Sequence, residues 1–328
     1  MPLIMVTGAA GFIGSVVTQA LLKEGHEVLS VDNLSRGHRS AIFEGTTFFR
    51  ISIGDGPALD KLFEQFKVDA VVHLAGLIQV GESVSDPDIY YANNLRDGLT
   101  LLESMHRCGV SKMIFSSSAA VYGVPNQTPI PEDHPIAPVN PYGDTKARME
   151  EALAWYGEAY DFQSVSLRYF NAAGASGPIG EDHRPETHLI PNAINVALGK
   201  QHHLSLYGDD YPTPDGTAIR DYVHVEDIAQ AHVQALGALG QLPRKAYNVG
   251  TGKGYSVREV IDIAARVCLE EIPVQVEPRR AGDPPELVAD ASALQTDLGW
   301  TPKFSTIEKM VQDAFRWHRD HENGYPGG

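Results

Sequence analysis

Three glycines near the N-terminus restrict the fold more than any other feature of the sequence. Gly8, Gly11 and Gly14 have GxxGxxG spacing and lie between a short apolar run over residues 3–7 and a segment with helical apolar spacing over residues 12–23. Glycines permit a tight turn from a strand into a helix and the close approach of a pyrophosphate to the backbone. The N–H groups at the helix N-terminus favour the same anion. The pattern predicts a βαβ unit that binds a dinucleotide.

An acidic residue at the end of the next strand indicates which dinucleotide is bound. The apolar run over residues 28–31 ends at Asp32, 18 residues after Gly14. A carboxylate at this position accepts hydrogen bonds from ribose hydroxyls and repels a 2'-phosphate, so NAD is favoured over NADP. Arg36 and Arg39 weaken this preference, because a guanidinium can bind a phosphate.

The rest of the chain alternates apolar strand patterns with helical ones. Strands are expected over residues 70–74, 112–117 and 164–168, with helices between them over residues 95–106 and 145–160. This alternation is typical of a parallel sheet that helices cover on both faces. We therefore predict an α/β fold with a Rossmann-type doubly wound parallel sheet and a smaller, interleaved C-terminal substrate lobe.

The composition changes after Asn171, where glycine, proline and histidine become frequent. We expect residues 1–171 to form the cofactor domain and residues 172–328 to form the substrate lobe. A helix followed by a strand within residues 224–250 is expected to return to the first sheet. Two further helices are expected in the smaller lobe, over residues 290–298 and 307–318.

The charge balance limits the partners of the chain. There are 26 Lys and Arg residues against 42 Asp and Glu residues, a formal net charge of −16. Such a protein repels nucleic acid and anionic membrane surfaces, so neither is expected as a partner. An anionic substrate would need a local cluster of basic side chains.

Compartment and metal content can also be estimated from the sequence. No apolar run reaches the roughly 18 residues of a membrane helix, and no N-terminal targeting segment is recognisable. The two cysteines, Cys108 and Cys268, stand in unrelated contexts, which fits a reducing compartment, so a cytoplasmic protein is expected. The 13 histidines include no HExxH spacing, so no metal is expected.

A second group of residues suggests proton transfer. Tyr142 and Lys146 are four residues apart, which places both side chains on one face of a helix. A tyrosine hydroxyl titrates near about 10, so a neighbouring ammonium is needed to stabilise its phenolate at neutral pH. Ser118 follows an apolar strand, at the edge where a parallel sheet presents side chains to its ligand. Tyr142, Lys146 and Ser118 are therefore the candidate catalytic residues.

Together these features resemble the extended short-chain dehydrogenase/reductase family, in particular its branch of UDP-sugar 4-epimerases. The likeness covers nearly the whole chain, and its longest segment is the most discriminating. In chain order the matching segments are residues 6–14, 73–76, 81–84, 116–123, 141–143, 168–171 and 208–225. The resemblance implies that Tyr142 removes the proton of a C4 hydroxyl while hydride passes to NAD. The resulting 4-keto sugar turns over and is reduced on its other face, with UDP-glucose and UDP-galactose as the expected pair.

The same resemblance implies two sets of binding residues. Besides the glycines, the NAD set is Phe12, Ile13, Asp32, Asn33, Ser52, Ile53, Leu74, Ala75, Gly76, Asn93, Ser116, Tyr142, Lys146 and Tyr169. Besides Ser118, the UDP-sugar set is Asn171, His188, Leu189, Leu206, Tyr207, Arg220, Arg280, Asp283 and Leu287. The arginines supply the local positive charge that a diphosphate needs.

Three positions depart from the family pattern. Ser52 replaces the usual Asp that faces the adenine, and Ile78 stands where many members have a Lys near the nicotinamide ribose. We expect weaker NAD retention as a result. Leu287 stands where some members have a bulky Tyr beside the sugar C2 substituent. The smaller side chain suggests that the pocket also admits the N-acetyl group of UDP-GlcNAc and UDP-GalNAc.

Several alternatives share the fold. A UDP-pentose epimerase, a nucleotide-sugar 4,6-dehydratase or a decarboxylase would also use NAD and the Tyr-Lys pair. Ala119 and Ala120 follow Ser118, where a dehydratase needs additional acid and base groups, so epimerisation is favoured. A non-catalytic NAD-binding regulator is a further possibility, because fold does not fix function. The resemblance also suggests a homodimer formed through helices of the NAD domain, one after Asn94 and one containing Tyr142.

Overall fold

A seven-stranded parallel sheet forms the larger part of the molecule. The structure is a computed structural model and describes residues 1–243, 245–280 and 282–326. In spatial order the strands are β10 (Ala246–Val249), β6 (Gln163–Tyr169), β5 (Lys112–Ser118), β4 (Ala70–His73), β1 (Leu3–Thr7), β2 (Glu27–Asp32) and β3 (Thr47–Arg50). All neighbouring strands in this sheet are parallel. The observed order reverses at β1, where an open α/β sheet presents a ligand crevice.

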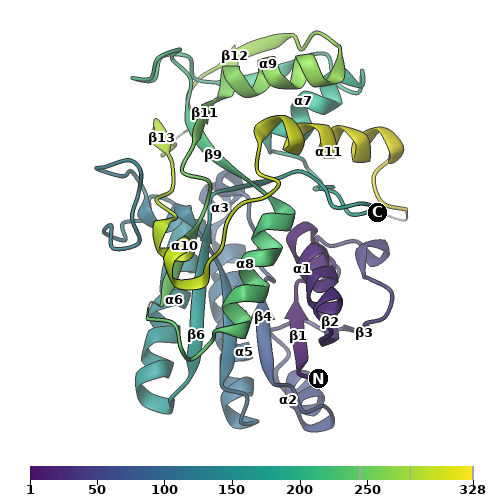
Figure 1. Cartoon of the computed structure of the whole chain (residues 1–328), viewed down its shortest axis with the longest axis vertical. Coiled ribbons are helices and arrows are strands. Elements are labelled where there is room, and N and C mark those ends of the chain that lie inside the picture. The colour runs from purple at the N-terminus through teal and green to yellow at the C-terminus, as the bar shows by residue number, and fades with distance from the viewer. Residues whose placement is uncertain (244, 281, 327–328) are drawn as a thin grey trace.

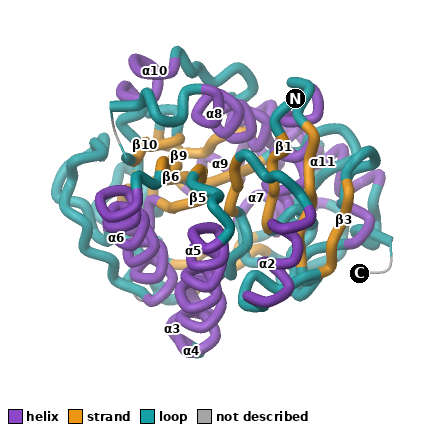
Figure 2. Tube along the Cα trace, turned by 90° about the horizontal axis from the view of Figure 1, so that it is seen from below, coloured by secondary structure: helices purple, strands orange, loops and turns teal. Residues whose placement is uncertain are grey.

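Helices cover both faces of this sheet, as predicted for a doubly wound fold. One face carries α1 (Phe12–Lys23), α8 (Val225–Gly237) and α10 (Ser292–Leu298), and the other carries α2 (Gly56–Gln65), α5 (Asp97–Arg107) and α6 (Pro141–Tyr160). Figure 2 shows the strands between these two layers, with α8 on one side and α5 and α6 on the other. Along β1, Ile4 and Val6 enter one core cluster whereas Met5 enters the opposite one. This alternation explains why the strands are almost continuously apolar.

A smaller lobe stands above the carboxyl ends of the sheet (Figure 1). Its four-stranded sheet contains β7 (Asn171–Ala173), β9 (Ile219–His224), β11 (Gly254–Ser256) and β13 (Glu286–Leu287), and a two-stranded sheet pairs β8 (Leu204–Tyr207) with β12 (Val274–Glu277). The helices α7 (Leu189–Ala197), α9 (Val257–Cys268) and α11 (Ile307–Asp320) pack together on a separate apolar core. The capping box of Ser256 and Glu259 marks the beginning of α9.

Three expectations about helices need correction. The helix containing Tyr142 begins at Pro141 rather than residue 145, because Asn140 caps it and Pro141 fits the first helical position. The helix expected over residues 95–106 is α5, which begins at Asp97 and ends at Arg107. A π-helical segment, Tyr91–Arg96, precedes it, and the short helices α3 (Val80–Ser85) and α4 (Pro87–Tyr90) precede that segment. The helix α10 does not belong to the smaller lobe: Leu294 joins the core of α1 and α8, so α10 packs against the large sheet.

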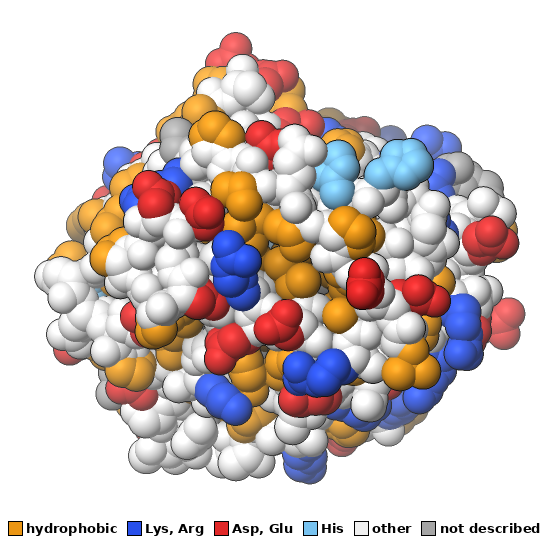
Figure 3. Space-filling view, turned by 90° about the horizontal axis from the view of Figure 1, so that it is seen from above, with side chains coloured by type: hydrophobic (Ala, Val, Ile, Leu, Met, Phe, Trp, Pro, Cys, Tyr) orange, Lys and Arg blue, Asp and Glu red, His pale blue; other side chains and the backbone are white. Residues whose placement is uncertain are grey.

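The surface is mixed in charge. On the face that Figure 3 shows, acidic and basic side chains are interspersed with hydrophobic ones. Within residues 1–243, 245–280 and 282–326, no helix has both the length and the apolar character required to cross a bilayer.

Candidate active site

A cavity of about 1280 Å³ lies at the carboxyl ends of the large sheet, below the smaller lobe. It extends from the glycine turn after β1 to the ends of β5 and β6, and its far wall includes residues of β8, β9 and β13. A cavity for one drug-sized ligand typically measures about 300–1,000 Å³. The observed cavity therefore has room for a dinucleotide and a second ligand.

The glycine turn at one end of the cavity requires glycine for steric reasons. Gly8 has a φ of +73°, and a Cβ atom there would lie 2.6 Å from the backbone nitrogen of Ala75. A Cβ atom on Gly14 would lie 2.0 Å from the carbonyl oxygen of Gly8. Gly11 is the N-cap of α1, and no side chain caps this helix end. The backbone N–H groups at this end therefore face the cavity without a side-chain acceptor and can bind a phosphate.

Asp32 lies at the end of β2, on the wall of the cavity beside this turn. Its carboxylate accepts hydrogen bonds from the backbone N–H of Ala10 at 3.0 Å and of Leu34 at 2.7 Å. Burial raises the pKa of Asp32, and the two N–H donors oppose this effect. The carboxylate is thus held in place for ribose hydroxyls.

The two arginines that weakened the NAD prediction each contact another side chain of the protein. Arg36 forms an ion pair with Glu82 at 2.6 Å, and the guanidinium of Arg39 stacks 4.5 Å above the ring centre of Phe48. Both arginines line the cavity, so the preference for NAD rests on the carboxylate of Asp32.

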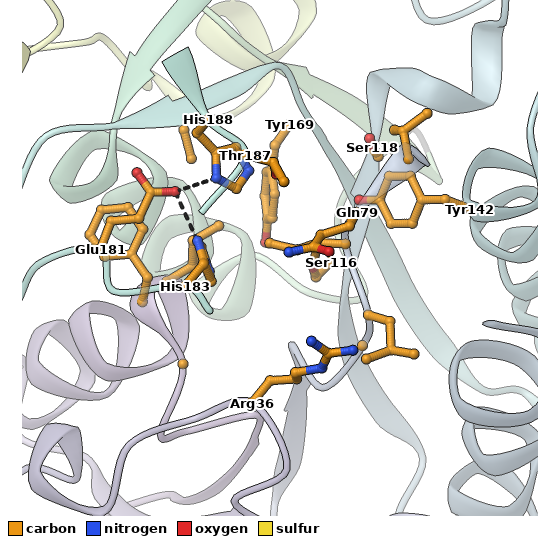
Figure 4. Close-up of a pocket in the computed structure, with 18 of the residues that line it drawn as sticks. Arg36, Gln79, Ser116, Ser118, Tyr142, Tyr169, Glu181, His183, Thr187 and His188 are labelled. Carbon is orange, nitrogen blue, oxygen red and sulfur yellow. Dashed lines mark ion pairs between the residues drawn. The ribbon is translucent and has the colours of Figure 1, made fainter. Parts of the chain in front are cut away.

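Tyr142, Lys146 and Ser118 meet at the middle of the cavity. Figure 4 shows the hydroxyl of Tyr142 on the side of Ser118, which ends β5. Lys146 lies one turn further along α6; its ammonium donates to the carbonyl of Ser116 at 2.7 Å and lies 5.9 Å from the ring centre of Tyr142. The helix α6 and the strand β5 thus bring the three side chains together, as the spacing of Tyr142 and Lys146 predicted.

Burial changes the proton affinities in this part of the cavity. It raises the pKa of Tyr142, and the hydroxyl of Ser118 opposes the rise. Burial lowers the pKa of Lys146 to about 8, against the effect of Glu150, and lowers the pKa of nearby His73 to about 3. Tyr142 therefore needs a bound cation or the Lys146 ammonium to ionise near neutral pH.

A buried ion pair fixes α6 against the sheet. Glu150, one turn after Lys146, forms an ion pair with Arg168 of β6 at 2.6 Å and accepts a hydrogen bond from Ser117 of β5 at 2.5 Å. Arg168 also donates to the hydroxyl of Tyr122 at 2.8 Å. These contacts join α6 to two strands, so they hold Lys146 and Tyr142 in position.

Nearly all predicted cofactor residues line the cavity. Those found on its wall are Gly8, Gly11, Phe12, Ile13, Gly14, Asp32, Asn33, Ile53, Leu74, Ala75, Gly76, Asn93, Ser116, Tyr142, Lys146 and Tyr169. Ser52 is not among the residues of the wall, although Ile51 and Ile53 are. Its hydroxyl instead accepts a hydrogen bond from the backbone N–H of Gly54 at 3.3 Å.

The predicted substrate residues come from several elements of the smaller lobe. Those on the cavity wall, together with Ser118, are Asn171, His188, Leu189, Tyr207, Arg220, Arg280, Asp283 and Leu287. Leu206 does not line the cavity. It is 1% exposed in the core of the smaller lobe, because alternate residues of β8 face opposite sides and Tyr207 takes the outward position.

Contacts within the protein orient the two arginines of this wall, Arg220 and Arg280. Arg220 forms an ion pair with Asp283 at 2.5 Å and donates to the carbonyl of Pro284 at 2.8 Å. The guanidinium of Arg280 lies 4.1 Å from the ring centre of Tyr207. In an otherwise acidic chain, these two arginines are suited to bind a diphosphate.

The sequence reasoning missed a cluster of charged residues at the cavity wall. Glu181, His183, Glu186 and His188 lie together in the loop between β7 and α7, and all but Glu186 line the cavity. Only His188 was among the predicted residues. Burial alone would lower the pKa values of both histidines, but the carboxylates outweigh it and raise them to about 9 for His183 and about 10 for His188. The spacing E-x-H-x-x-E-x-H is the sequence signal that was available.

Comparison with known proteins places the chain in a family. The sequence model of the NAD-dependent epimerase/dehydratase family matches residues 4–250. The chain is 47% identical to UDP-glucose 4-epimerase of Halalkalibacterium halodurans over 98% of this chain and 97% of that protein.

Solved structures show the same likeness. The crystal structure of UDP-glucose 4-epimerase from Bifidobacterium longum with NAD⁺ and UDP has a TM-score of 0.93 and 38% identity, over 98% of this chain and 100% of that one. The UDP-Glc/GlcNAc 4-epimerase of Campylobacter jejuni has a TM-score of 0.85 and 40% identity, over 98% of this chain and 100% of that one. With the family match spanning most of its length, this chain belongs to the NAD-dependent epimerase/dehydratase family.

Proposed function

We propose that the chain is an NAD-dependent UDP-glucose 4-epimerase that interconverts UDP-glucose and UDP-galactose. The observation that carries this proposal is the meeting of Tyr142, Lys146 and Ser118 opposite Arg220 in one cavity that also contains the glycine turn. The cavity thus combines a dinucleotide site, a proton-transfer group and a diphosphate site. The named relatives are 4-epimerases of UDP-sugars, and they match almost the full length of the chain, which supports the same function.

The proposed mechanism assigns a separate task to each side chain. Tyr142 takes the proton of the C4 hydroxyl while Ser118 donates a hydrogen bond to the same sugar oxygen. Lys146 stabilises the phenolate of Tyr142 by its positive charge. The glycine turn and Asp32 would hold NAD, which would supply the acceptor and donor of the C4 hydride. The residues of the smaller lobe hold the nucleotide, so that the 4-keto sugar can turn and receive the hydride on its other face.

The alternatives lose support at one position. After Ser118 the chain forms a 3₁₀ turn, Ala119–Tyr122, with alanines at its first two positions. A 4,6-dehydratase or a decarboxylase requires an additional proton-transfer group beside the sugar, and these methyl groups provide none. A non-catalytic regulator would not require the assembled Tyr142, Lys146 and Ser118.

A division of labour between the two parts of the chain belongs to the same proposal. Residues 1–171 with the returning segment 224–250 hold NAD, and residues from 172 onward, apart from that segment and α10, hold the UDP-sugar. The parallel pairing of β10 with β6 and the pairing of β7 with β9 support this division.

We also propose that the enzyme is a cytoplasmic homodimer. Trp155 and Tyr160 of α6 are 65% and 51% exposed, and the rings of Tyr160 and His106 of α5 lie 4.1 Å apart. Exposed aromatic side chains on two adjacent helices are typical of an interface. Both cysteines are free thiols, which is consistent with a reducing compartment.

The decisive experiment is incubation of the purified protein with UDP-galactose, without added NAD, followed by NMR of the sugars. Appearance of UDP-glucose up to the equilibrium mixture is the expected result and requires cofactor retained from the cell. A 4-keto-6-deoxy product would point to a dehydratase. No change with NAD supplied would refute the proposed substrate pair, and UDP-xylose and UDP-arabinose would then be tested.

A further inference from the structure

The loop between β7 and α7 contains four side chains of the kind that bind transition metals. Glu181, His183, Glu186 and His188 each offer one ligand atom, and these atoms all lie within 4.8 Å of one another. We propose that this loop binds one divalent ion of the zinc type through these four side chains, as a structural site in the cavity wall. This inference is independent of the sugar that the enzyme converts, because metal binding is measured without substrate.

The distances between the ligand atoms fit a tetrahedral ion. Nδ1 of His188 lies 2.9 Å from Oε1 of Glu181 and 2.7 Å from Oε1 of Glu186. Nδ1 of His183 lies 3.1 Å from Oε1 of Glu181 and 3.7 Å from Oε2 of Glu186. Zinc bonds of about 2.0–2.2 Å in tetrahedral geometry place ligand atoms about 3.3–3.5 Å apart. The observed separations bracket this value, so small side-chain movements complete the site.

One buried atom in the cluster has charged neighbours but no well-oriented hydrogen bond. Nδ1 of His183 lies near the carboxylates of Glu181 and Glu186, and neither contact has hydrogen-bond geometry. A buried polar atom without a hydrogen bond costs free energy, and most such atoms in proteins are satisfied. A metal ion at the centre of the cluster would satisfy this nitrogen, which carboxylate contacts alone do not do.

Backbone N–H groups orient the carboxylate of Glu186, one of the four proposed ligands. Oε1 of Glu186 accepts hydrogen bonds from the backbone N–H groups of Thr187 at 2.7 Å and His188 at 2.8 Å. These contacts fix the carboxylate and leave its Oε2 on the side of His183. Hydrogen bonds of this kind orient metal ligands and raise the affinity of a site.

The charges of the cluster balance a divalent ion. Metal binding displaces the protons of the two histidines, and the two carboxylates and two neutral imidazoles then carry a charge of −2, which one Zn²⁺ neutralises. Neighbouring charged groups of the loop have other partners: Asp182 pairs with Arg184 at 3.2 Å and its carbonyl contacts His38 at 2.7 Å. All four ligands lie within eight residues, so closing this loop around an ion costs little chain entropy.

The location suggests what the ion does. Figure 4 shows Glu181, His183 and His188 beside Tyr169, across the cavity from Tyr142. The same loop contacts the NAD part of the chain, because Gln79 donates to the carbonyl of Pro185 at 2.8 Å. An ion here would hold the loop that forms the substrate side of the wall, without contacting the reacting atoms.

Calorimetric titration of the chelator-treated, full-length protein with Zn²⁺ tests the proposal. We expect one ion per chain with a Kd of about 10⁻⁷ M or lower, as for other structural zinc sites. Replacement by Co²⁺ should give the intense visible bands of tetrahedral cobalt. Absence of binding at micromolar Zn²⁺ would overturn the proposal.

Matched variants locate the binding. His183→Asn should weaken Zn²⁺ binding by at least about 100-fold, because one of four ligands is lost. Glu181→Gln should do the same and keeps the side-chain volume, and circular dichroism shows whether each variant is folded. The exposed pair His202 and His203 is the control. If the double substitution H202N/H203N removes the binding and His183→Asn does not, the ion is adventitious and the proposed site is wrong.

Discussion

Buried ionisable groups differ in charge state between the two walls of the cavity. On the side of the large sheet, burial shifts groups toward their neutral forms: on the wall the pKa of Lys146 falls to about 8 and that of Tyr142 rises, and behind the wall the pKa of His73 falls to about 3. On the wall formed by the smaller lobe, charged groups are buried with partners of opposite sign, as Arg220 is with Asp283 and the loop histidines are with Glu181 and Glu186.

This difference separates chemistry from binding. A group that moves a proton must change its charge during the reaction, so it benefits from an environment where the neutral and charged forms are close in free energy. A group that holds a diphosphate must keep its charge, so it benefits from compensation. The comparison predicts that substitutions on the sheet wall mainly lower kcat, whereas those on the lobe wall mainly raise KM.

The largest effect is expected for Tyr142→Phe. Loss of the hydroxyl removes the proton acceptor, so kcat for UDP-galactose should fall by about 10²–10⁴-fold. The affinity for UDP, measured by calorimetry, should stay within a factor of about 3, because the ring remains and the nucleotide binds the other wall. Tyr255→Phe, at a tyrosine of β11 outside the residues that line the cavity, is the matched control and should keep full activity. A near-normal kcat of the Tyr142→Phe variant would show that the sheet wall does not supply the proton acceptor.

The lobe wall is tested by Arg220→Met, which keeps the length of the side chain and removes its charge. Loss of a buried, charge-assisted contact to phosphate should cost about 2–3 kcal/mol, that is a KM about 30- to 150-fold higher, with kcat changed much less. Arg279→Met is the control, because Arg279 pairs with Asp210 on an exposed part of the same lobe. A fall in kcat at unchanged KM would contradict the separation of the two walls.

The same effect of burial can be measured through stability at His73, which lies behind the sheet wall at the end of β4. His73 is 1% exposed, and its pKa is lowered from the ordinary value of 6.5 to about 3. Below pH 6.5 the unfolded chain binds a proton at this residue whereas the folded protein does not. Stability is therefore lost as the pH falls from 6.5 toward 3, at a rate of about 1.4 kcal/mol per pH unit.

Urea unfolding at pH 6.5, 5.5 and 4.5, with saturating NAD, tests this expectation. His73→Asn should reduce the pH dependence by about 1.4 kcal/mol per unit in the lower part of the range. His202→Asn, an exposed residue, should leave the dependence unchanged. If both variants follow the wild-type curve, His73 does not resist protonation in the folded protein.

The sheet wall was also the part that could be predicted from sequence. The strand over residues 3–7 and the helix over residues 12–23 have the predicted bounds, because Gly8 and Gly14 leave one way for the chain to turn. Each motif of this wall lies within a short stretch of sequence, so it can be recognised without knowledge of distant segments. The topology of a parallel sheet then brings the strand ends together. Asp32, Ser118 and Tyr142 therefore line one cavity, as expected.

The lobe wall was harder to predict because its residues come from distant segments. Leu206 faces the core since the register of β8 depends on pairing with β12, which the sequence of β8 alone does not reveal. The loop cluster was missed because its histidines are not spaced as a helical metal motif, and its loop gave no periodic pattern. On the sheet side, the beginning of α6 was misplaced because the capping role of Asn140 was not considered.

The smallest expected effect concerns the boundary between the two walls, at Leu287. This residue of β13 lines the cavity, pairs in register with Arg220 of β9 and packs against the cluster of Ala119 and Phe170. It thus touches the sheet wall and the lobe wall at once. A Tyr at this position would enlarge the side chain beside the sugar without changing charge, so neither proton transfer nor diphosphate binding should be altered directly.

The variant Leu287→Tyr therefore isolates the space available to the sugar. We expect wild type to turn over UDP-GlcNAc, and the variant to lower kcat/KM for UDP-GlcNAc about 5- to 10-fold more than for UDP-glucose. This factor corresponds to about 1–1.4 kcal/mol, the lower end of the range of about 1–3 kcal/mol for steric exclusion of a small group. Leu287→Met, which conserves volume, should keep the wild-type ratio. Equal losses for both sugars in the tyrosine variant would mean that Leu287 supports the two walls rather than the specificity. No turnover of UDP-GlcNAc by wild type at millimolar concentration would show that other residues already exclude the N-acetyl group.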